Sequence, residues 1–484
     1  MPIPTSANFL EASESIIDFQ NFDGTGLKRP SDLPAPTYES RKKLLELLSE
    51  SHRVYNLLYS QELRYHNHTP HVLISMYYLG CSAQQLEKYF QNIVKSLLLW
   101  KDIDSLPVRD ETWSEYIADK QHVRGYFDFY SEKSVNTKKK NWKLLVNKYL
   151  TKSFSDKQTG KLKRLLDGFF GGLMHTVIHL GYAMELDDEN LGIEAITLAT
   201  TEYNDYGLDK LMGENAVLTR SSLKKESDGP GDSVLHILEL IQGDHRFDTG
   251  PVIIHPDQFF AGLISKQDLI AEYANKLVIT QENLNQVLHE LLHAAVLLTF
   301  TTYRDEDAEK GQPCYSFFLL HLLTSLHAII EIWNISFGNQ QAKEASQAVI
   351  VEDEFVGVVL DYWITFIGVY VFQLRPTFKE SRVDVTIEAF GRNRQHMPAQ
   401  NKVWGEIHQI LFGDGTKKVD YDCHILKCIR CLLFVQEYLK DEYGDPSIYS
   451  KMAFMMAATM PGKRFVGFPG EDGLMLDIVG GGEK

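Results

Sequence analysis

The stretch Tyr315–Trp333, YSFFLLHLLTSLHAIIEIW, is apolar at most positions and is typical of a buried helix. Similar helical patterns recur in five other stretches, which are 41–58, 161–186, 282–303, 355–372 and 423–443. Alternating strand patterns with Asn-Gly or Asp-Gly hairpin signals are scarce. The sequence therefore predicts a mainly α fold, organised as one large, bundle-like helical domain.

The N-terminal segment differs from this helical body. Residues 1–38 contain five prolines among polar residues, so we expect an irregular arm there and the helical domain over residues 39–484. Two polar, glycine-containing stretches, 224–232 and 304–313, are expected to be surface loops. With 484 residues, of which 44% are hydrophobic, the chain is long enough to bury a large core.

Composition limits the partners. The formal net charge of −16 argues against non-specific nucleic-acid binding, which depends on Lys and Arg neutralising phosphates, and favours a small molecule or a protein. Five unevenly placed cysteines and an N-terminus without signal-peptide order predict a cytoplasmic protein. The run 355–372 is nearly long enough to cross a bilayer, but Asp361 within it favours a buried core helix and no membrane partner.

Residues 286–295, QVLHELLHAA, contain the His-Glu-x-x-His signature of zinc peptidases. On a helix, His289 and His293 would share one face, with Glu290 as the general base. However, no Gly-x-x-His continuation follows, and the residues beyond offer no glutamate as a third ligand. We therefore expect that these two histidines share no metal, and a zinc peptidase is the least favoured of three hypotheses.

The stretch 423–431, CHILKCIRC, places His424, Cys428 and Cys431 on one side of a helix. A Cys-x-x-Cys zinc site normally needs a second pair elsewhere, and a thioredoxin-like motif needs a strand before its helix. Cysteines on an apolar helix face are usually small core residues. A structural role is therefore expected here.

Histidines also occur in three other apolar helical stretches. Each one alone would ordinarily be a core residue with a hydrogen-bond partner, because a buried imidazole needs one. Three apolar helices that each carry imidazoles favour instead one interior metal site built from neutral rings, which suit iron, zinc, copper or nickel. The histidines concerned are His66, His68, His71, His175, His179 and His321.

Together these three stretches resemble the questin oxidase-like family, whose characterised members act in fungal aromatic polyketide pathways. Residues 66–90, HNHTPHVLISMYYLGCSAQQLEKYF, are similar to its His-Asn-His-x-x-His segment. Residues 171–186, GGLMHTVIHLGYAMEL, are similar to its Gly-Gly-x-x-His-Pro-x-Ile-His-x-Gly-Tyr signature, with Thr176 in place of proline. Residues 315–325, YSFFLLHLLTS, resemble its Asp-Phe-Phe-x-x-His-x-x-Thr-Ser helix, with Ser316 in place of the acid.

The resemblance implies a mainly α-helical oxygenase that inserts oxygen into, or cleaves a ring of, a polycyclic aromatic ketone or quinone. Family members have been described both as NADPH-dependent Baeyer-Villiger oxidases and as metal-dependent oxygenases. The sequence favours metal dependence, because no Gly-x-Gly-x-x-Gly turn follows a predicted strand and no Rossmann module is therefore expected.

The leading hypothesis is a non-haem oxygenase that uses iron(II), O2 and a small aromatic substrate, with NADPH as a candidate reductant. His179 and Tyr182 are the expected catalytic residues, which orient ligands or move protons. The expected metal ligands come from a pool of five histidines, which are His68, His71, His175, His179 and His321.

One departure from the family supports a second hypothesis. Many relatives carry a Trp-Lys-Gly step in the helix corresponding to 358–376, where this chain has Asp361, Tyr362 and Trp363. If the family lysine helps to hold the metal, this chain would use Asp361 or water in its place, or would have lost activity. The alternative is therefore a non-catalytic helical scaffold or binding protein with the same fold.

Overall fold

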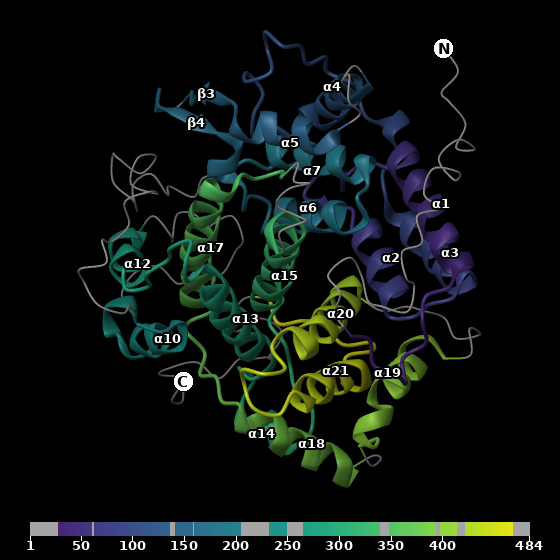
Figure 1. Ribbon diagram of the computed structural model, residues 1–484, viewed down its shortest axis with the longest axis vertical. Coiled ribbons are helices and arrows are strands. Elements are labelled where there is room, and N and C mark those ends of the chain that lie inside the picture. Colours follow the sequence, from purple (N-terminus) through teal and green to yellow (C-terminus); the bar gives the residue numbers. More distant parts are fainter. Residues whose placement is uncertain are drawn as a thin grey trace.

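The computed structural model describes residues 28–60, 62–135, 141–157, 159–204, 232–248, 265–338, 348–393, 397–413 and 422–467. Helices dominate this part of the chain (Figure 1), which confirms the predicted fold class. Its sheets are two small antiparallel pairs, in which β1 (Leu58–Tyr59) pairs with β2 (Tyr65–His66) and β3 (Ser153–Ser155) pairs with β4 (Leu162–Arg164).

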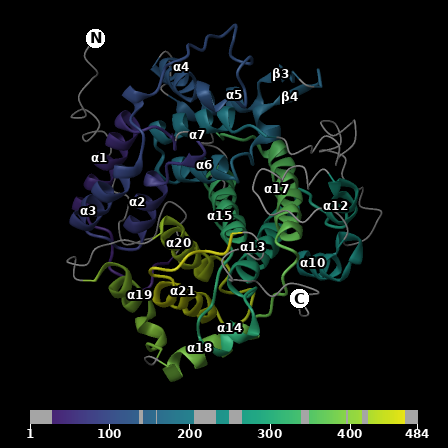
Figure 2. The same ribbon diagram turned by 180° about the vertical axis from the view of Figure 1, so that it is seen from behind.

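The centre of the molecule is α15 (Phe317–Phe337), which is buried along nearly its whole length. It packs against α6 (His175–Leu186), α13 (Leu284–Phe300), α17 (Glu352–Phe372) and α20 (Cys423–Tyr438). Figures 1 and 2 show α15 between these helices from both sides. Its apolar sequence follows from this position, because a helix surrounded by other helices is apolar all round.

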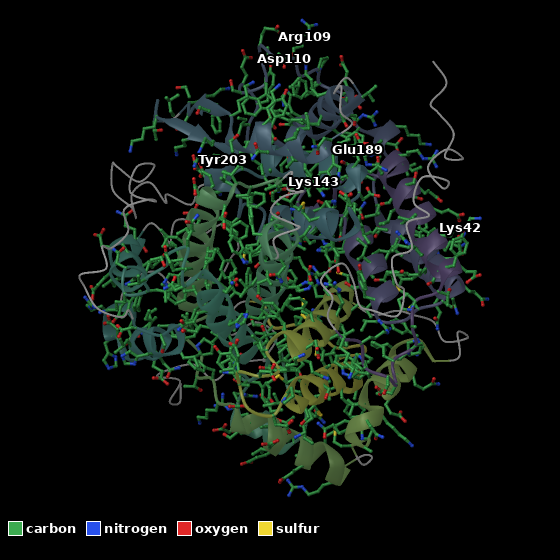
Figure 3. All side chains as sticks on the ribbon, in the orientation of Figure 1. Lys42, Arg109, Asp110, Lys143, Glu189 and Tyr203 are labelled. Carbon is green, nitrogen blue, oxygen red and sulfur yellow. The ribbon has the colours of Figure 1, made fainter. Side chains whose placement is uncertain are left out.

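The remaining helices surround this centre, and side chains fill the space between them (Figure 3). Among them, α7 packs on α6, and α2 packs on α20 and α6. They are α1 (Tyr38–Val54), α2 (Thr69–Tyr78), α3 (Ala83–Ile93), α4 (Val123–Val135), α5 (Trp142–Thr151), α7 (Glu189–Thr201), α10 (Val234–Gly243), α12 (Gln267–Ala274), α14 (Asp305–Glu309), α18 (Ser381–Asn393), α19 (Val403–Phe412) and α21 (Ser447–Thr459).

Two helices, α15 and α17, are long and apolar enough to cross a membrane by length and composition. Within the protein, 89% of the most apolar window of α15 and 100% of that of α17 is buried. Asp361 of α17 is buried as well, with 1% of its surface exposed. The prediction that 355–372 is a buried core helix is confirmed.

The predicted helix over 161–186 is wrong in its first half. Residues 162–164 form β4, and α6 begins only at His175. Residues 172–174 have the left-handed φ angles 58°, 51° and 64°, which end any helix. Just before this turn the chain passes close to Glu202, and a Cβ atom on Gly171 would lie 1.8 Å from the Glu202 carbonyl oxygen.

Three smaller expectations concern the loops and the arm. The stretch 304–313, expected to be a loop, contains the short helix α14. The stretch 224–232 lies, except for its last residue, outside the described residues. Of the N-terminal arm, residues 28–37 are described; they are irregular, and Leu33 within them is buried.

Candidate metal centre

The start of α2 supplies two histidines, of which His71 is buried and His68 is half-buried. Pro70 occupies the first turn of the helix, where its missing N–H group costs nothing. The Asn67 side chain accepts a hydrogen bond of 2.9 Å from the Thr69 backbone N–H. His68 is therefore the N-cap residue, and His71 lies one turn into the helix.

His68 contacts histidines from two other helices, and a histidine from a third lies beside those two. Its Nε2 atom lies 2.8 Å from Nε2 of His175, which opens α6. The ring of His321 on α15 lies 5.0 Å from those of His175 and His424 between centroids, and the ring of His424 on α20 lies 4.9 Å from that of His68. The potential ligand atoms of His175, His321 and His424 all lie within 4.8 Å of one another. We call His68, His175, His321 and His424 the histidine cluster.

Two rings of the histidine cluster are oriented by the backbone. His175 Nδ1–H donates to the Gly172 carbonyl oxygen at 2.7 Å, and His321 Nδ1–H donates to the Phe317 carbonyl oxygen at 2.6 Å. In a neutral imidazole the other nitrogen then carries the lone pair. Both Nε2 atoms are therefore available as ligands, in the arrangement that usually surrounds a metal ion.

His424 is oriented by its own helix cap. Its Nδ1–H donates to the Asp422 carboxylate at 2.7 Å, and Cys423 Sγ lies 3.3 Å from the same nitrogen. The Nε2 atoms of His424 and His321 are buried and have no hydrogen-bond partner among the described residues. Leaving such atoms without a partner costs about 1–3 kcal/mol each. A shared ion would remove this cost for both.

Burial keeps these rings neutral. Desolvation, with Coulomb repulsion from neighbouring groups, holds the pKa of His68, His175 and His321 well below the usual range. The same causes lower the pKa of His424 to about 4. Neutral imidazole is the form that binds metal ions, so the protonation state suits a metal centre.

Two groups of described side chains could hold a metal: one is His68, Cys423 and His424, and the other is His175, His321 and His424. His71 and His179, both expected ligands, belong to neither group. They form instead a row beside the histidine cluster. His71 Nε2 lies 3.0 Å from His179 Nδ1, and His179 Nε2–H donates to the Glu194 carboxylate at 2.8 Å. The other oxygen of Glu194 lies 2.9 Å from His52 Nδ1.

Tyr182, an expected catalytic residue, borders this row. Its ring stacks on that of His71, with 5.1 Å between centroids, and its hydroxyl group lies 3.0 Å from Ser75 Oγ. Burial raises its pKa above the usual range, which the nearby Arg430 guanidinium only partly offsets. Tyr182 is therefore a neutral phenol that supports His71 from one side.

His66 contacts the histidine cluster from the opposite side. Its ring stacks on His175 with 4.0 Å between centroids, and its Nε2 lies 3.4 Å from the Glu202 carboxylate. Glu202 also binds Lys120 at 2.8 Å. Glu194 and Glu202 belong to α7 and its C-terminal cap, so one helix supplies both carboxylates.

Lys427 is a residue that sequence reasoning missed. It lies one turn after His424 on α20, its surface is fully buried, and its Nζ has no hydrogen-bond partner among the described residues. Burial lowers its pKa, because the charged ammonium loses its hydration. His424 itself was expected to have a structural role, whereas its position brings it into the histidine cluster. Asp361 belongs to neither of the groups of described residues that could hold a metal.

The His-Glu-x-x-His segment has other roles. His289 Nδ1 lies 2.5 Å from the Glu442 carboxylate, and the His293 ring stacks on Tyr443 with 4.0 Å between centroids. Glu290 accepts a hydrogen bond of 3.1 Å from the backbone N–H that begins α10. The two histidines thus have separate partners, and Cys428 and Cys431 are buried in the core as expected.

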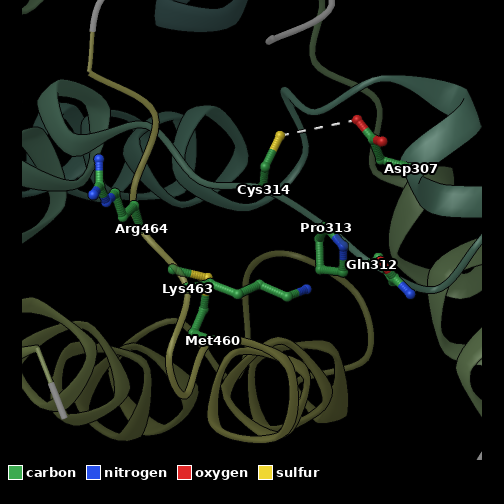
Figure 4. A pocket seen from close by; sticks show the side chains of 7 residues that line it. All are labelled: Asp307, Gln312, Pro313, Cys314, Met460, Lys463 and Arg464. Atoms are coloured by element: carbon green, nitrogen blue, oxygen red, sulfur yellow. Dashed lines mark hydrogen bonds between the residues drawn. The ribbon is translucent and has the colours of Figure 1, made fainter. Parts of the chain in front are cut away.

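A surface hollow of about 400 Å³ is lined by other residues (Figure 4). It is lined by residues 312–314 before α15 and by Lys463 and Arg464 after α21. Burial raises the pKa of the Cys314 thiol to about 12, so this sulfur is not an activated nucleophile. None of the predicted site residues lines this hollow.

Several known proteins are similar in sequence to this chain. A protein named Baeyer-Villiger oxidase from Pestalotiopsis microspora is 24% identical over 60% of this chain and 64% of its own length. A second protein named Baeyer-Villiger oxidase, from Pestalotiopsis fici, is 23% identical over 63% of this chain and 65% of its own length. A questin oxidase from Aspergillus terreus is 22% identical over 63% of this chain and 66% of its own length. The chain thus spans a little under two thirds of the length of these relatives.

The family comparison covers more of the chain. Residues 65–432 match the family described as Questin oxidase-like, and this range contains all four members of the histidine cluster as well as Lys427. The match extends over well more than half of the 484 residues. The chain therefore belongs to the questin oxidase-like family.

Proposed function

We propose that this chain is a metal-dependent oxygenase that acts on a small aromatic ketone or quinone with O2. The names of the relatives, Baeyer-Villiger oxidase and questin oxidase, support the oxygenase part. One observation carries the metal part: the Nε2 atoms of His321 and His424 are buried without a partner, while hydrogen bonds hold both Nδ1 atoms. The arrangement presents bare nitrogens toward one another.

In this proposal the histidine cluster holds the ion, with Lys427 beside it. Its donors are neutral nitrogens, which suit iron, zinc, copper and nickel. Iron(II) is the ion proposed, because a bound iron would supply the one-electron chemistry that lets O2 react with an organic molecule. His71 and His179 then lie outside the ligand set, where they orient groups and move protons.

Half-buried aromatic side chains border the site. The Phe317 ring lies 4.6 Å from that of His321 and 4.9 Å from that of His424, and the Phe465 ring lies 6.0 Å from His424, between centroids. A dry site strengthens each electrostatic interaction within it and protects reactive species from water. Flat apolar walls also suit a polycyclic aromatic substrate.

The need for a reductant depends on the reaction. Insertion of one oxygen atom beside a carbonyl consumes the ketone, O2, two electrons and two protons, and yields an ester and water. A hydride donor such as NADPH would supply the two electrons together with one proton equivalent. Ring cleavage that incorporates both oxygen atoms needs no external reductant. Dependence of O2 consumption on NADPH therefore distinguishes these two reactions.

The test uses the full chain, purified without a histidine tag or chelator and loaded anaerobically with iron(II). We expect about one iron per chain by mass spectrometry, because the histidine cluster supplies the donors of one mononuclear site. We also expect iron-dependent O2 consumption with a hydroxyanthraquinone. His321→Ala should lose both the metal and the activity, whereas His293→Phe, on α13, should keep both. Substoichiometric content of every transition metal in the wild-type protein would favour the scaffold hypothesis.

A further inference from the structure

Four side chains form an unbroken hydrogen-bonded row from near the surface to the histidine cluster. His52, on α1, lies 2.9 Å from Glu194, which lies 2.8 Å from His179, which lies 3.0 Å from His71. The Glu194 and His179 side chains are each 2% exposed, whereas that of His52 is 12% exposed. Only the His52 end of the row therefore reaches water.

The charge of Glu194 determines which atoms of this row donate hydrogen bonds and which accept them. Burial alone would raise the pKa of Glu194, but hydrogen bonds from His179 and His52 outweigh burial and lower the pKa to about 2. Glu194 is thus a carboxylate that only accepts hydrogen bonds, so His179 must donate from Nε2. His179 Nδ1 lies 3.0 Å from His71 Nε2. With one hydrogen on His179, at Nε2, its Nδ1 accepts, and His71 must donate to it from Nε2.

The hydrogen on Nε2 determines the state of the other ring nitrogen of His71, Nδ1. With its hydrogen on Nε2, neutral His71 has a lone pair on Nδ1. This Nδ1 atom is buried and has no hydrogen-bond partner among the described residues. The His71 ring lies beside the histidine cluster, with 5.7 Å between its centroid and that of His68.

We propose that Glu194 is a positioning residue: acting through His179, it fixes the hydrogen of His71 on Nε2 and so keeps His71 Nδ1 as a bare acceptor beside the histidine cluster. The group that this acceptor suits is the hydroxyl of a phenolic or enolic substrate, whose hydrogen it would receive. This use of the acceptor rests on the proposed oxygenase function, whereas the position of the hydrogen does not.

Glu202 provides the matched comparison. It is the second buried carboxylate supplied by α7 and likewise joins an interior histidine, His66, to a residue nearer the surface. That residue is Lys120, whose ammonium directly balances the carboxylate charge. No described contact connects Glu202 to His179 or His71 in the way that Glu194 is connected. Replacement of Glu202 should therefore leave the His71 hydrogen where it is.

The experiment reads the hydrogen positions directly, by long-range ¹H–¹⁵N NMR of metal-free, full-length protein labelled at histidine, at mildly alkaline pH. Spectra of His71→Gln and His179→Gln serve only to assign the signals. In the wild-type protein both rings should carry hydrogen on Nε2. In Glu194→Gln, the side-chain NH2 group can donate to His179, so the signal of His71 should shift toward the form with hydrogen on Nδ1. Glu202→Gln should show the wild-type pattern.

Two results would overturn the proposal. The first is a wild-type spectrum in which His71 carries its hydrogen on Nδ1 or His179 carries a hydrogen on both nitrogens. This spectrum is recorded on the wild-type protein, so it does not depend on the folding of a variant. The other is a His71 signal that Glu194→Gln leaves unchanged. In iron-loaded protein, Glu194→Gln should lower kcat by about 10- to 100-fold at unchanged metal content and with KM little altered. If no oxygenase activity exists, the NMR result still decides the position of the hydrogen.

Discussion

The Nε2 atoms of His68 and His175 lie 2.8 Å apart, although 107 residues separate them in the sequence. Two nitrogens this close either share one hydrogen or bind one ion. Ligands at about 2.1 Å from an ion and at right angles to one another lie about 3 Å apart, so the spacing suits neighbouring positions on a metal. His175 Nδ1 already donates to the backbone, which leaves its Nε2 for this role.

We expect that His175→Gln lowers bound iron well below that of the wild-type protein. The amide would keep part of the hydrogen bonding in the interior but would remove one nitrogen ligand from the histidine cluster. Metal content after anaerobic loading, measured with circular dichroism to confirm folding, tests this expectation. His327→Gln is a matched control, because His327 is also buried but contacts Arg430. An unchanged iron content in His175→Gln would contradict a site built on this pair.

Lys427→Met should have opposite effects on stability and on metal content. The apolar side chain fills the same space without a buried amine, so the free energy of unfolding of the metal-free protein should rise by about 1–3 kcal/mol. Loss of a nitrogen beside His424 should at the same time reduce iron retention. Urea unfolding of the metal-free form and metal analysis of the loaded form measure the two effects separately. A destabilised metal-free variant would show that the amine has a stabilising partner.

The sequence indicated three of the four cluster histidines, because His68, His175 and His321 each stand in an apolar helix where a core residue is expected. It did not indicate His424, because the pattern of the stretch 423–431 is also typical of an apolar helix face that carries small core cysteines. Glu194 belongs to no motif, and its role depends on the packing of α7 against α6. Such contacts between distant segments have no local signal in the sequence.

The turn before α6 is a second feature that the sequence pattern did not predict. Helical spacing predicted a continuous helix, whereas Gly172 has a φ of 58° and lies against the side chains of His66 and Glu202. Gly172→Ala would place a Cβ atom 2.8 Å from His66 Nε2. We expect a loss of about 1–3 kcal/mol in the free energy of unfolding, from backbone strain together with the displaced imidazole.

The control for Gly172→Ala is Gly243→Ala, at the end of α10. Among the described residues, no atom outside its own helical turn lies within 4 Å of a Cβ at Gly243, and its backbone is not left-handed. This variant should be neutral or slightly more stable, because alanine reduces the freedom of the unfolded chain. Chemical denaturation of both variants measures the difference. Equal stabilities would contradict the assignment of a required close approach at Gly172.

The buried His293 should make the free energy of unfolding depend on pH. Burial lowers its pKa from 6.5 to about 4, and the residue is 8% exposed. Below about pH 6.5 the unfolded chain binds a proton at this ring, whereas the folded chain binds it only below about pH 4. Stability is therefore full above pH 6.5 and is lost as the pH falls toward 4, by about 3 kcal/mol for this one group.

His293→Phe isolates this contribution, because phenylalanine retains the stacking on Tyr443 but cannot titrate. The variant should lose less stability than the wild-type protein between pH 7 and pH 4, while His236→Gln, at an exposed position, should follow the wild-type curve. Urea unfolding of metal-free protein at several pH values gives the three curves, since bound metal would add its own pH dependence. Parallel curves for His293→Phe and wild type would show that His293 takes up its proton without unfolding, by turning its ring to water.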